Sequence, residues 1–90
     1  MCAASYATSA VGALESLRKI KYGLLKKLSK QEIIDCSEKF GNFGCNSGTP
    51  TNSFKYVAAK GISDDSQYPY SGAAKACQTQ YATFKITGYV

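Results

Sequence analysis

Cysteine is the residue type in these 90 residues whose chemistry depends most on pairing. The four cysteines are Cys2, Cys36, Cys45 and Cys77. No two of them have the close spacing of a zinc site, and the chain contains no histidine, so we expect no metal and no other cofactor. An even number of cysteines in a short chain favours two disulfides, made in a lysosomal or extracellular (secretory) compartment. Four cysteines allow three pairings, and their spacing does not choose among them.

Charge is the next property that limits the function. Eleven basic and six acidic residues give a net charge of +5. The basic residues are spread along the chain and form no dense patch interleaved with aromatic residues, so we interpret them as solvated helix faces and expect no nucleic-acid partner. No apolar run approaches the roughly 18 residues needed to cross a bilayer, and we therefore expect no membrane partner.

The first element that could position a reactive side chain is a helix over residues 5–22. Its charged residues, among them Glu15, Arg18 and Lys19, gather on one side, and Gly23 is the expected stop. Ser5 lies at the start, where a serine can cap the helix and stabilise it by about 1 kcal/mol. The apolar residues recur at three- and four-residue steps and predict a buried stripe: Ala7, Ala10, Val11, Leu14 and Leu17.

A second, short helix is expected from Ser29 to Cys36. Ser29 and Glu32 have the spacing of a capping box, in which the hydroxyl and the carboxylate both bind free backbone amides. Residues 37–49 are rich in turn formers and are predicted to be loop.

A third helix begins at Pro50, which suits a first helical position, with Thr49 as its cap. We expect it to end near Gly61, with its buried side formed by Phe54, Val57 and Ala58. Residues 64–73 look irregular. Residues 84–90 alternate between apolar and polar side chains, as in a half-buried strand. The pattern predicts an α+β fold of three helices, long loops and one C-terminal strand.

Five motifs resemble, in order, those of the papain-type cysteine proteases, in particular the cathepsin L-like members. The chain has CAASYATSA at 2–10, SAVGALE at 9–15, LSKQEIIDC at 28–36, GCNSG at 44–48 and SQYPY at 66–70. The corresponding family motifs include CGSCWAFS, LSEQxLVDC, GCNGG and ESYPY. The resemblance covers nearly the whole chain.

This resemblance implies that residues 1–90 are part of a peptidase domain, namely its mostly helical left lobe with disulfide-tied loops. The β-rich right lobe would be missing from the chain and would be its partner. We therefore expect the face of the first helix that bears Ala7, Ala10, Val11 and Leu14 to be partly exposed, and the isolated lobe to be prone to aggregation. The family pairing implies the disulfides Cys2–Cys45 and Cys36–Cys77, each stabilising by about 3–4 kcal/mol through chain entropy.

The resemblance also places Ser5 at the position of the nucleophilic cysteine. A serine hydroxyl is too weakly acidic to ionise as the thiolate does, and the family's histidine and asparagine lie in its second half. We therefore expect a papain-type peptidase scaffold without proteolysis. The neighbours Ala3, Tyr6 and Thr8 also differ from the family, which favours divergence over a single engineered change. Two alternatives remain: an active hydrolase in a full-length or cysteine-bearing form, and a silica-condensing protein, since the Ser-Tyr pair resembles the silicateins.

The peptide cleft is better kept than the nucleophile. Gly48 matches the glycine that presents its backbone to an extended peptide or protein substrate, where a side chain would block close approach. The substrate-binding residues implied are Asn46, Ser47, Gly48, Thr49 and Pro50. Gly48 could instead be an ordinary turn glycine, and Asn46 and Ser47 could be loop formers. We interpret Tyr68 and Tyr70 as packing residues.

Overall fold

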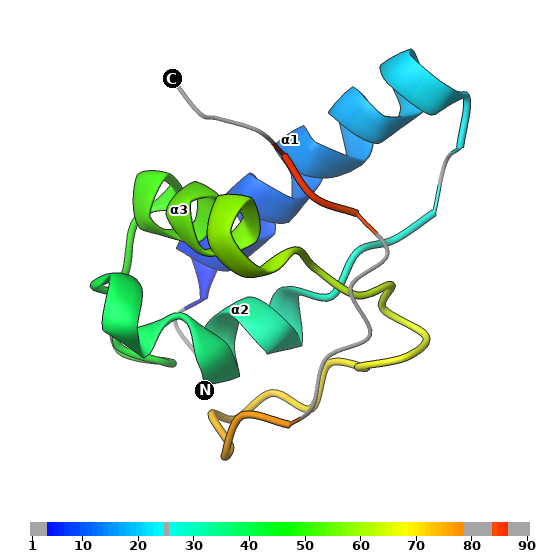
Figure 1. Ribbon diagram of the computed structural model, residues 1–90. Coiled ribbons are helices and arrows are strands. Elements are labelled where there is room, and N and C mark those ends of the chain that lie inside the picture. Colours follow the sequence, from blue (N-terminus) through cyan, green and yellow to red (C-terminus); the bar gives the residue numbers. More distant parts are fainter. Residues whose placement is uncertain (1–3, 25, 79–83, 87–90) are drawn as a thin grey trace.

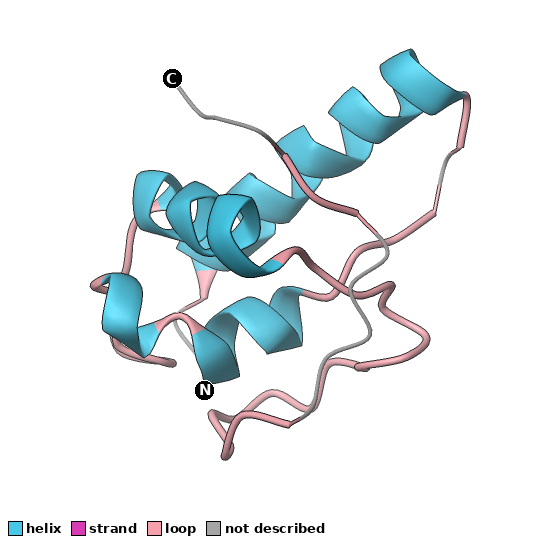
Figure 2. Ribbon diagram, viewed as in Figure 1, coloured by secondary structure: helices cyan, strands magenta, loops and turns pink. Residues whose placement is uncertain are grey.

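The computed structural model of the chain describes residues 4–24, 26–78 and 84–86. The described part contains the helices α1 (Ser5–Tyr22), α2 (Lys30–Cys36) and α3 (Pro50–Lys60), and the short 3₁₀ helix η1 (Glu38–Phe40). In Figure 1, α3 lies across the first half of α1, and α2 lies below both. Figure 2 shows that loops make up the rest of the described chain. The predicted mostly helical lobe is confirmed, and η1 is an addition inside the predicted loop.

The helix ends follow the residues that predicted them. Gly23 adopts a left-handed conformation (φ +70°), and its N–H donates to the Lys19 carbonyl at 2.9 Å. This conformation is costly for any residue with a Cβ, so glycine ends the helix. At α3, Pro50 is the first helical residue, and the Thr49 hydroxyl accepts a hydrogen bond from the Asn52 amide at 3.0 Å. Both boundaries are confirmed.

Two capping predictions are wrong. The N-cap of α1 is Ala4, which offers no side-chain bond, and Ser5 is the first helical residue with an exposed side chain. Ser29 does cap α2 through the Glu32 amide, but the Glu32 carboxylate does not complete a capping box. That carboxylate is fully buried and accepts from the Tyr56 hydroxyl at 2.5 Å and from the Ser63 amide at 2.9 Å. These two donors outcompete the local amide, because they come from the core that α3 closes over α2.

The buried side of α1 differs from the predicted stripe at its last turn. Ala7, Ala10, Val11 and Leu14 are buried as predicted, but Leu17 is 39% exposed and Arg18 is only 3% exposed. Arg18 takes the core position because an acidic partner from another segment neutralises it. The expectation that the first four would be partly exposed is therefore wrong.

The third helix also buries more than its apolar residues. Val57 is fully buried, whereas Phe54 and Ala58 are partly buried at the edge of the core. Tyr56 and Ser53 are buried as well, because each has a hydrogen-bond partner inside the fold.

A disulfide ties the long loop after α3 to the end of α2, and isolated bridges join loop segments to one another. Cys36 and Cys77 form a disulfide with a Cα–Cα distance of 4.9 Å, as the resemblance implied. The predicted partner of Cys45 is Cys2, which lies outside the described residues, so that pairing stays a prediction. Of the predicted strand 84–90, Phe84 forms an antiparallel bridge with Ile62, and residues 87–90 lie outside the described part.

Four of the six large apolar side chains exposed in the described part of the chain lie at the far end of α1, and the other two are Phe43 and Tyr70. Ile20 is 81% exposed, and it has partly exposed apolar neighbours in Leu17, Tyr22 and Leu24. We therefore still expect the isolated lobe to aggregate, but through the exposed side chains at the end of α1 instead of the buried stripe. None of the helices in the described residues is both long and apolar enough to cross a membrane.

Candidate functional site

The start of α1 places Ser5 beside the turn at residues 43–48. The Ser5 side chain is exposed, while the next residue, Tyr6, is 5% exposed and turns into the core. The Tyr6 hydroxyl donates a hydrogen bond to the Gly44 carbonyl at 2.6 Å. Burial, and then the nearby Asp35 carboxylate, raise the pKa of Tyr6, so its hydroxyl stays a donor at neutral pH. One hydrogen bond thus joins the residue after Ser5 to the 43–48 turn, whose last residues belong to the predicted substrate-binding segment.

The turn itself is closed by backbone bonds. The Phe43 amide donates to the Ser47 carbonyl at 2.7 Å, and the Asn46 amide donates to the Phe43 carbonyl at 2.9 Å. Gly44 has a positive φ of +56° at the first bend. The predicted site residues follow on the outer side of this turn. Gly48 is half-buried, and the other four are exposed: Asn46, Ser47, Thr49 and Pro50.

Gly48 is required for a reason that the sequence did not reveal. A Cβ atom at this position would lie 2.6 Å from the Asn42 Oδ1 and 2.9 Å from the Tyr6 Cδ2. Both distances are shorter than real Cβ contacts, so a side chain here would strike the interior of the lobe. The absent side chain therefore faces inward, and close packing between the turn and α1 is what excludes it.

Asn42 is the buried residue that holds the second end of the turn, and sequence reasoning missed it. Its Oδ1 accepts from the Thr49 amide at 3.0 Å. Its Nδ2 donates to the hydroxyls of Ser37 at 2.8 Å and Ser53 at 3.2 Å. The only signal was its type, because asparagine in a turn-rich loop looks like an ordinary loop former.

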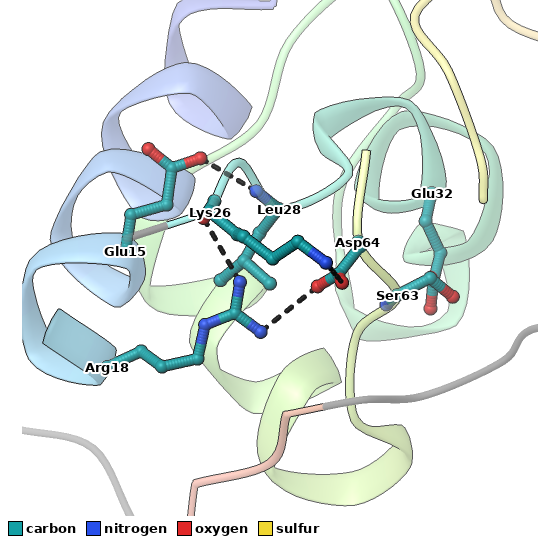
Figure 3. Close-up of polar contacts among 7 residues, drawn as sticks. All are labelled: Glu15, Arg18, Lys26, Leu28, Glu32, Ser63 and Asp64. Atoms are coloured by element: carbon teal, nitrogen blue, oxygen red, sulfur yellow. Dashed lines mark hydrogen bonds and ion pairs between the residues drawn. The ribbon is translucent and has the colours of Figure 1, made fainter. Parts of the chain in front are cut away.

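A second group of polar side chains ties the loop after α3 to the helices (Figure 3). Arg18 donates to the Asp64 carboxylate and to the Lys26 carbonyl, each at 3.0 Å. Lys26 adds an ion pair to Asp64 at 3.6 Å. Glu15, one turn earlier on α1, accepts from the Leu28 amide at 2.8 Å. These contacts join three segments that are distant in sequence, and they explain why the predicted solvated charge at Arg18 is wrong.

The two tyrosines of the SQYPY motif have different roles. Tyr68 is buried and donates to the Asp35 carboxylate at 2.7 Å. Burial raises the pKa of Tyr68 to about 12, helped by Asp35 and opposed by a hydrogen bond from the Gln78 amide. Tyr70 is 43% exposed, and the Lys30 ammonium lies 4.3 Å from the centre of its ring. The packing interpretation therefore fits Tyr68 better than Tyr70.

The predicted site residues lie at the surface of the described part of the chain. A cavity of about 340 Å³ lies along α1, lined by residues including Thr8, Glu15 and Tyr70, but Ser5 and residues 46–50 are not part of its wall. Within residues 4–24, 26–78 and 84–86, no three histidine, cysteine, aspartate or glutamate side chains gather as metal ligands. The arrangement can therefore present an exposed loop edge at residues 46–50 next to the start of α1, where the Ser5 hydroxyl is exposed.

Comparison with known proteins supports the resemblance. The profile of the papain family cysteine proteases matches residues 1–90. The chain is 40% identical over 91 residues to a cathepsin L-like proteinase of Phaedon cochleariae, covering 98% of the chain and 28% of the relative. It is 47% identical over 79 residues to cathepsin S of Mus musculus, covering 84% of the chain and 23% of the relative. The chain thus spans about a quarter of the length of such curated relatives.

Solved structures agree in fold. Digestive procathepsin L 3 of the Tenebrio molitor larval midgut superposes with a TM-score of 0.93 at 34% identity, covering 97% of this chain and 29% of that one. Bromelain from Ananas comosus, solved with an inhibitor, gives 0.88 at 34% identity, covering 97% and 40%. Together with the α1 start, the 43–48 turn and the Cys36–Cys77 disulfide, these matches show that the chain belongs to the papain family of cysteine proteases.

Proposed function

We propose that this chain is the helical lobe of a papain-family protein that binds extended peptides but does not hydrolyse them through Ser5. The observation that carries the proposal is the exposed Ser5 hydroxyl on the first turn of α1, beside an intact 43–48 turn. The helix start and the turn have the arrangement expected of the family, but serine replaces the cysteine that would supply the thiol.

The chemistry of a serine at this position argues against proteolysis. The partial positive charge of a helix N-terminus stabilises a thiolate, but a hydroxyl has a much higher pKa and stays protonated. A serine needs a general base in hydrogen-bond reach, and these 90 residues include no histidine. An activating histidine would therefore have to come from residues beyond these 90.

Peptide binding is supported by the exposed edge at residues 46–50. An extended peptide binds such an edge through main-chain hydrogen bonds, which need accessible backbone and no intervening side chains. Gly48 lets the chain pack closely against Asn42 and Tyr6. Its neighbours Asn46, Ser47, Thr49 and Pro50 are exposed and leave this edge accessible. The proposed ligand class is therefore an extended peptide or protein segment.

The exposed face of α1 supports a second lobe as partner. Its exposed residues from Ser5 through Ser16 are uncharged, and Leu17 and Ile20 continue this face. We infer that residues 1–90 form only the left lobe of the domain, and that a right lobe packs on this face. The disulfide at Cys36 supports a secretory or lysosomal location, because such bonds persist in oxidising compartments.

A nucleophile replacement tests the proposal in a protein that joins this chain to the remaining part of a papain-family domain. We expect no peptide hydrolysis with Ser5, measurable hydrolysis with Ser5→Cys, and the same binding of a labelled peptide in both. Ser5→Ala is the matched control, which should bind peptide like the natural chain. Peptide hydrolysis that depends on Ser5 would contradict the proposal and favour an active serine-based hydrolase. Silica condensation that is lost in Ser5→Ala would favour the mineral-forming alternative.

A further inference from the structure

Tyr6 contacts the 43–48 turn at both of its ends. Its hydroxyl donates to the Gly44 carbonyl at 2.6 Å. The edge of its ring borders Gly48 so closely that a Cβ atom there would lie 2.9 Å from the Tyr6 Cδ2. The residue is 5% exposed and belongs to the first turn of α1, directly after Ser5. One rigid side chain therefore spans the distance between the nucleophile position and the peptide-binding edge.

The Tyr6 hydrogen bond is fixed by the physics of burial. A buried phenol hydroxyl needs an acceptor, and leaving it without one costs about 1–3 kcal/mol. The Gly44 carbonyl supplies that acceptor, and Gly44 can turn its carbonyl toward α1 because it adopts a positive φ of +56°. The sequence pattern of the family has tryptophan at this position, so this phenol contact is a feature of this chain.

We propose that the Tyr6 hydroxyl is a positioning group, which holds the 43–48 turn at a fixed position relative to Ser5 at the start of α1. Asn42 holds the other end of the turn through the Thr49 amide, so the edge is fixed at two points. The consequence is that an extended peptide bound along Gly48 meets residue 5 in one register. The positioning itself stands on the geometry, and its effect on a peptide rests on the proposed function.

The first experiment compares Tyr6→Phe with Tyr56→Phe in the full chain. Each variant removes one buried phenol oxygen, at the Gly44 carbonyl or at the Glu32 carboxylate. In Tyr6→Phe we expect an upfield shift of the Gly44 carbonyl carbon and about fivefold faster amide hydrogen exchange at Phe43 and Asn46, since a lost hydrogen bond of about 1 kcal/mol has that effect. Tyr56→Phe should leave those signals unchanged and accelerate exchange at Ser63.

Two results would overturn the positioning role. An unchanged Gly44 carbonyl signal in Tyr6→Phe would mean that the hydroxyl does not hold the turn. An equal acceleration of exchange across all three helices would mean that Tyr6 contributes to global stability only.

The second experiment measures peptide hydrolysis in the Ser5→Cys form of the complete domain, with a fluorogenic peptide as the probe. Adding Tyr6→Phe should raise KM several-fold and lower kcat, because the peptide is then held less firmly and meets residue 5 out of register. Adding Tyr56→Phe should change neither. An unchanged KM would refute the effect on register, whereas an inactive Ser5→Cys parent would count against the proposed function and leave the exchange result standing.

Discussion

The loop at 37–49 joins α2 to α3, the loop at 61–78 follows α3, and the two are held by different chemistry. Neutral groups hold the first loop, chiefly the Asn42 amide and the Tyr6 hydroxyl. The second loop is held by the Cys36–Cys77 disulfide and by neutral contacts such as the one from Ser29 to Tyr68, and three carboxylates add to these. Glu32 accepts from the Ser63 amide at 2.9 Å, and Asp35 accepts from the Lys75 amide at 2.8 Å. Asp64 completes this set through its ion pair with Arg18.

The difference shows how each loop depends on its surroundings. Hydrogen bonds between neutral groups are directional and do not change with salt, so the first loop keeps its geometry wherever packing is intact. Bonds to carboxylates are stronger one by one, but each buried charge requires its partners to be present. The candidate binding edge lies in the loop with neutral anchors, and the other loop fixes the helices to one another.

The largest effect is expected from breaking the charged anchor. Arg18→Ala should lower the free energy of unfolding by about 3–5 kcal/mol, because it leaves the largely buried Asp64 carboxylate and the Lys26 carbonyl without their main donor. Denaturant unfolding measures this. The exposed Lys19→Ala is the control and should change stability by less than about 0.5 kcal/mol. A loss below about 1 kcal/mol in Arg18→Ala is the value of a surface ion pair. It would show that the charged anchor of the second loop contributes no more stability than a neutral one.

The neutral anchor should show a smaller effect with a specific coupling. Asn42→Ala should cost about 2–3 kcal/mol, since it removes three hydrogen bonds of a buried side chain, namely those to the Ser37 and Ser53 hydroxyls and from the Thr49 amide. Gly48→Ala should be destabilising alone, because its methyl group overlaps the Asn42 oxygen, and less so in the Asn42→Ala background. A double-mutant cycle by denaturant unfolding should give a coupling above about 0.5 kcal/mol. Simple additivity would mean that the turn relaxes away from Asn42.

Alkaline pH should loosen the second loop through Tyr68. Its pKa is raised to about 12 in the folded chain, from an ordinary 10.0 in the unfolded one. The raised pKa means that the folded state keeps its proton longer, so stability is full below pH 10 and falls as pH rises toward about 12. Urea midpoints over this range, with Tyr68→Phe as the comparison, should show a shallower decline in the variant. Identical slopes would assign the loss to other groups.

The smallest expected difference is between the stability losses on removing the caps of α2 and α3. Ser29→Ala should cost about 1–2 kcal/mol, because the buried hydroxyl caps α2 and also donates to the Tyr68 carbonyl at 2.6 Å. Thr49→Ala should cost about 0.5–1 kcal/mol, since its exposed hydroxyl only caps α3. Thermal unfolding of both variants measures the order. A reversed order would show that the loop around Tyr68 tolerates the loss by rearranging.

Local chemistry in the sequence was enough to predict the helix boundaries and the family. Gly23 and the Thr49–Pro50 pair act within a few residues, so their effect can be derived without the fold. Leu17 and Arg18 could not be assigned in this way, because the acid that makes Arg18 a core residue is Asp64, 46 positions later. Glu32 failed for the same reason, since its partner Tyr56 comes from α3.

The candidate site was predictable in position but not in construction. The motif at 44–48 placed the edge beside Ser5, and the structure brings these segments together through Tyr6. The buried role of Asn42 and the inward direction of the missing Gly48 side chain depend on packing across the loop, which a linear pattern does not contain.

The Arg18 contact also bears on the order in which the lobe assembles. Contacts inside α1 and α2 link near neighbours and form fast, whereas the Arg18–Asp64 pair must wait for a chain segment 46 positions away. Until that segment arrives, the guanidinium has no acidic partner on the core side of its helix, and the cost of desolvating it opposes early collapse. The lobe should therefore gain its tight core only in the late, rate-limiting step that closes the loop after α3.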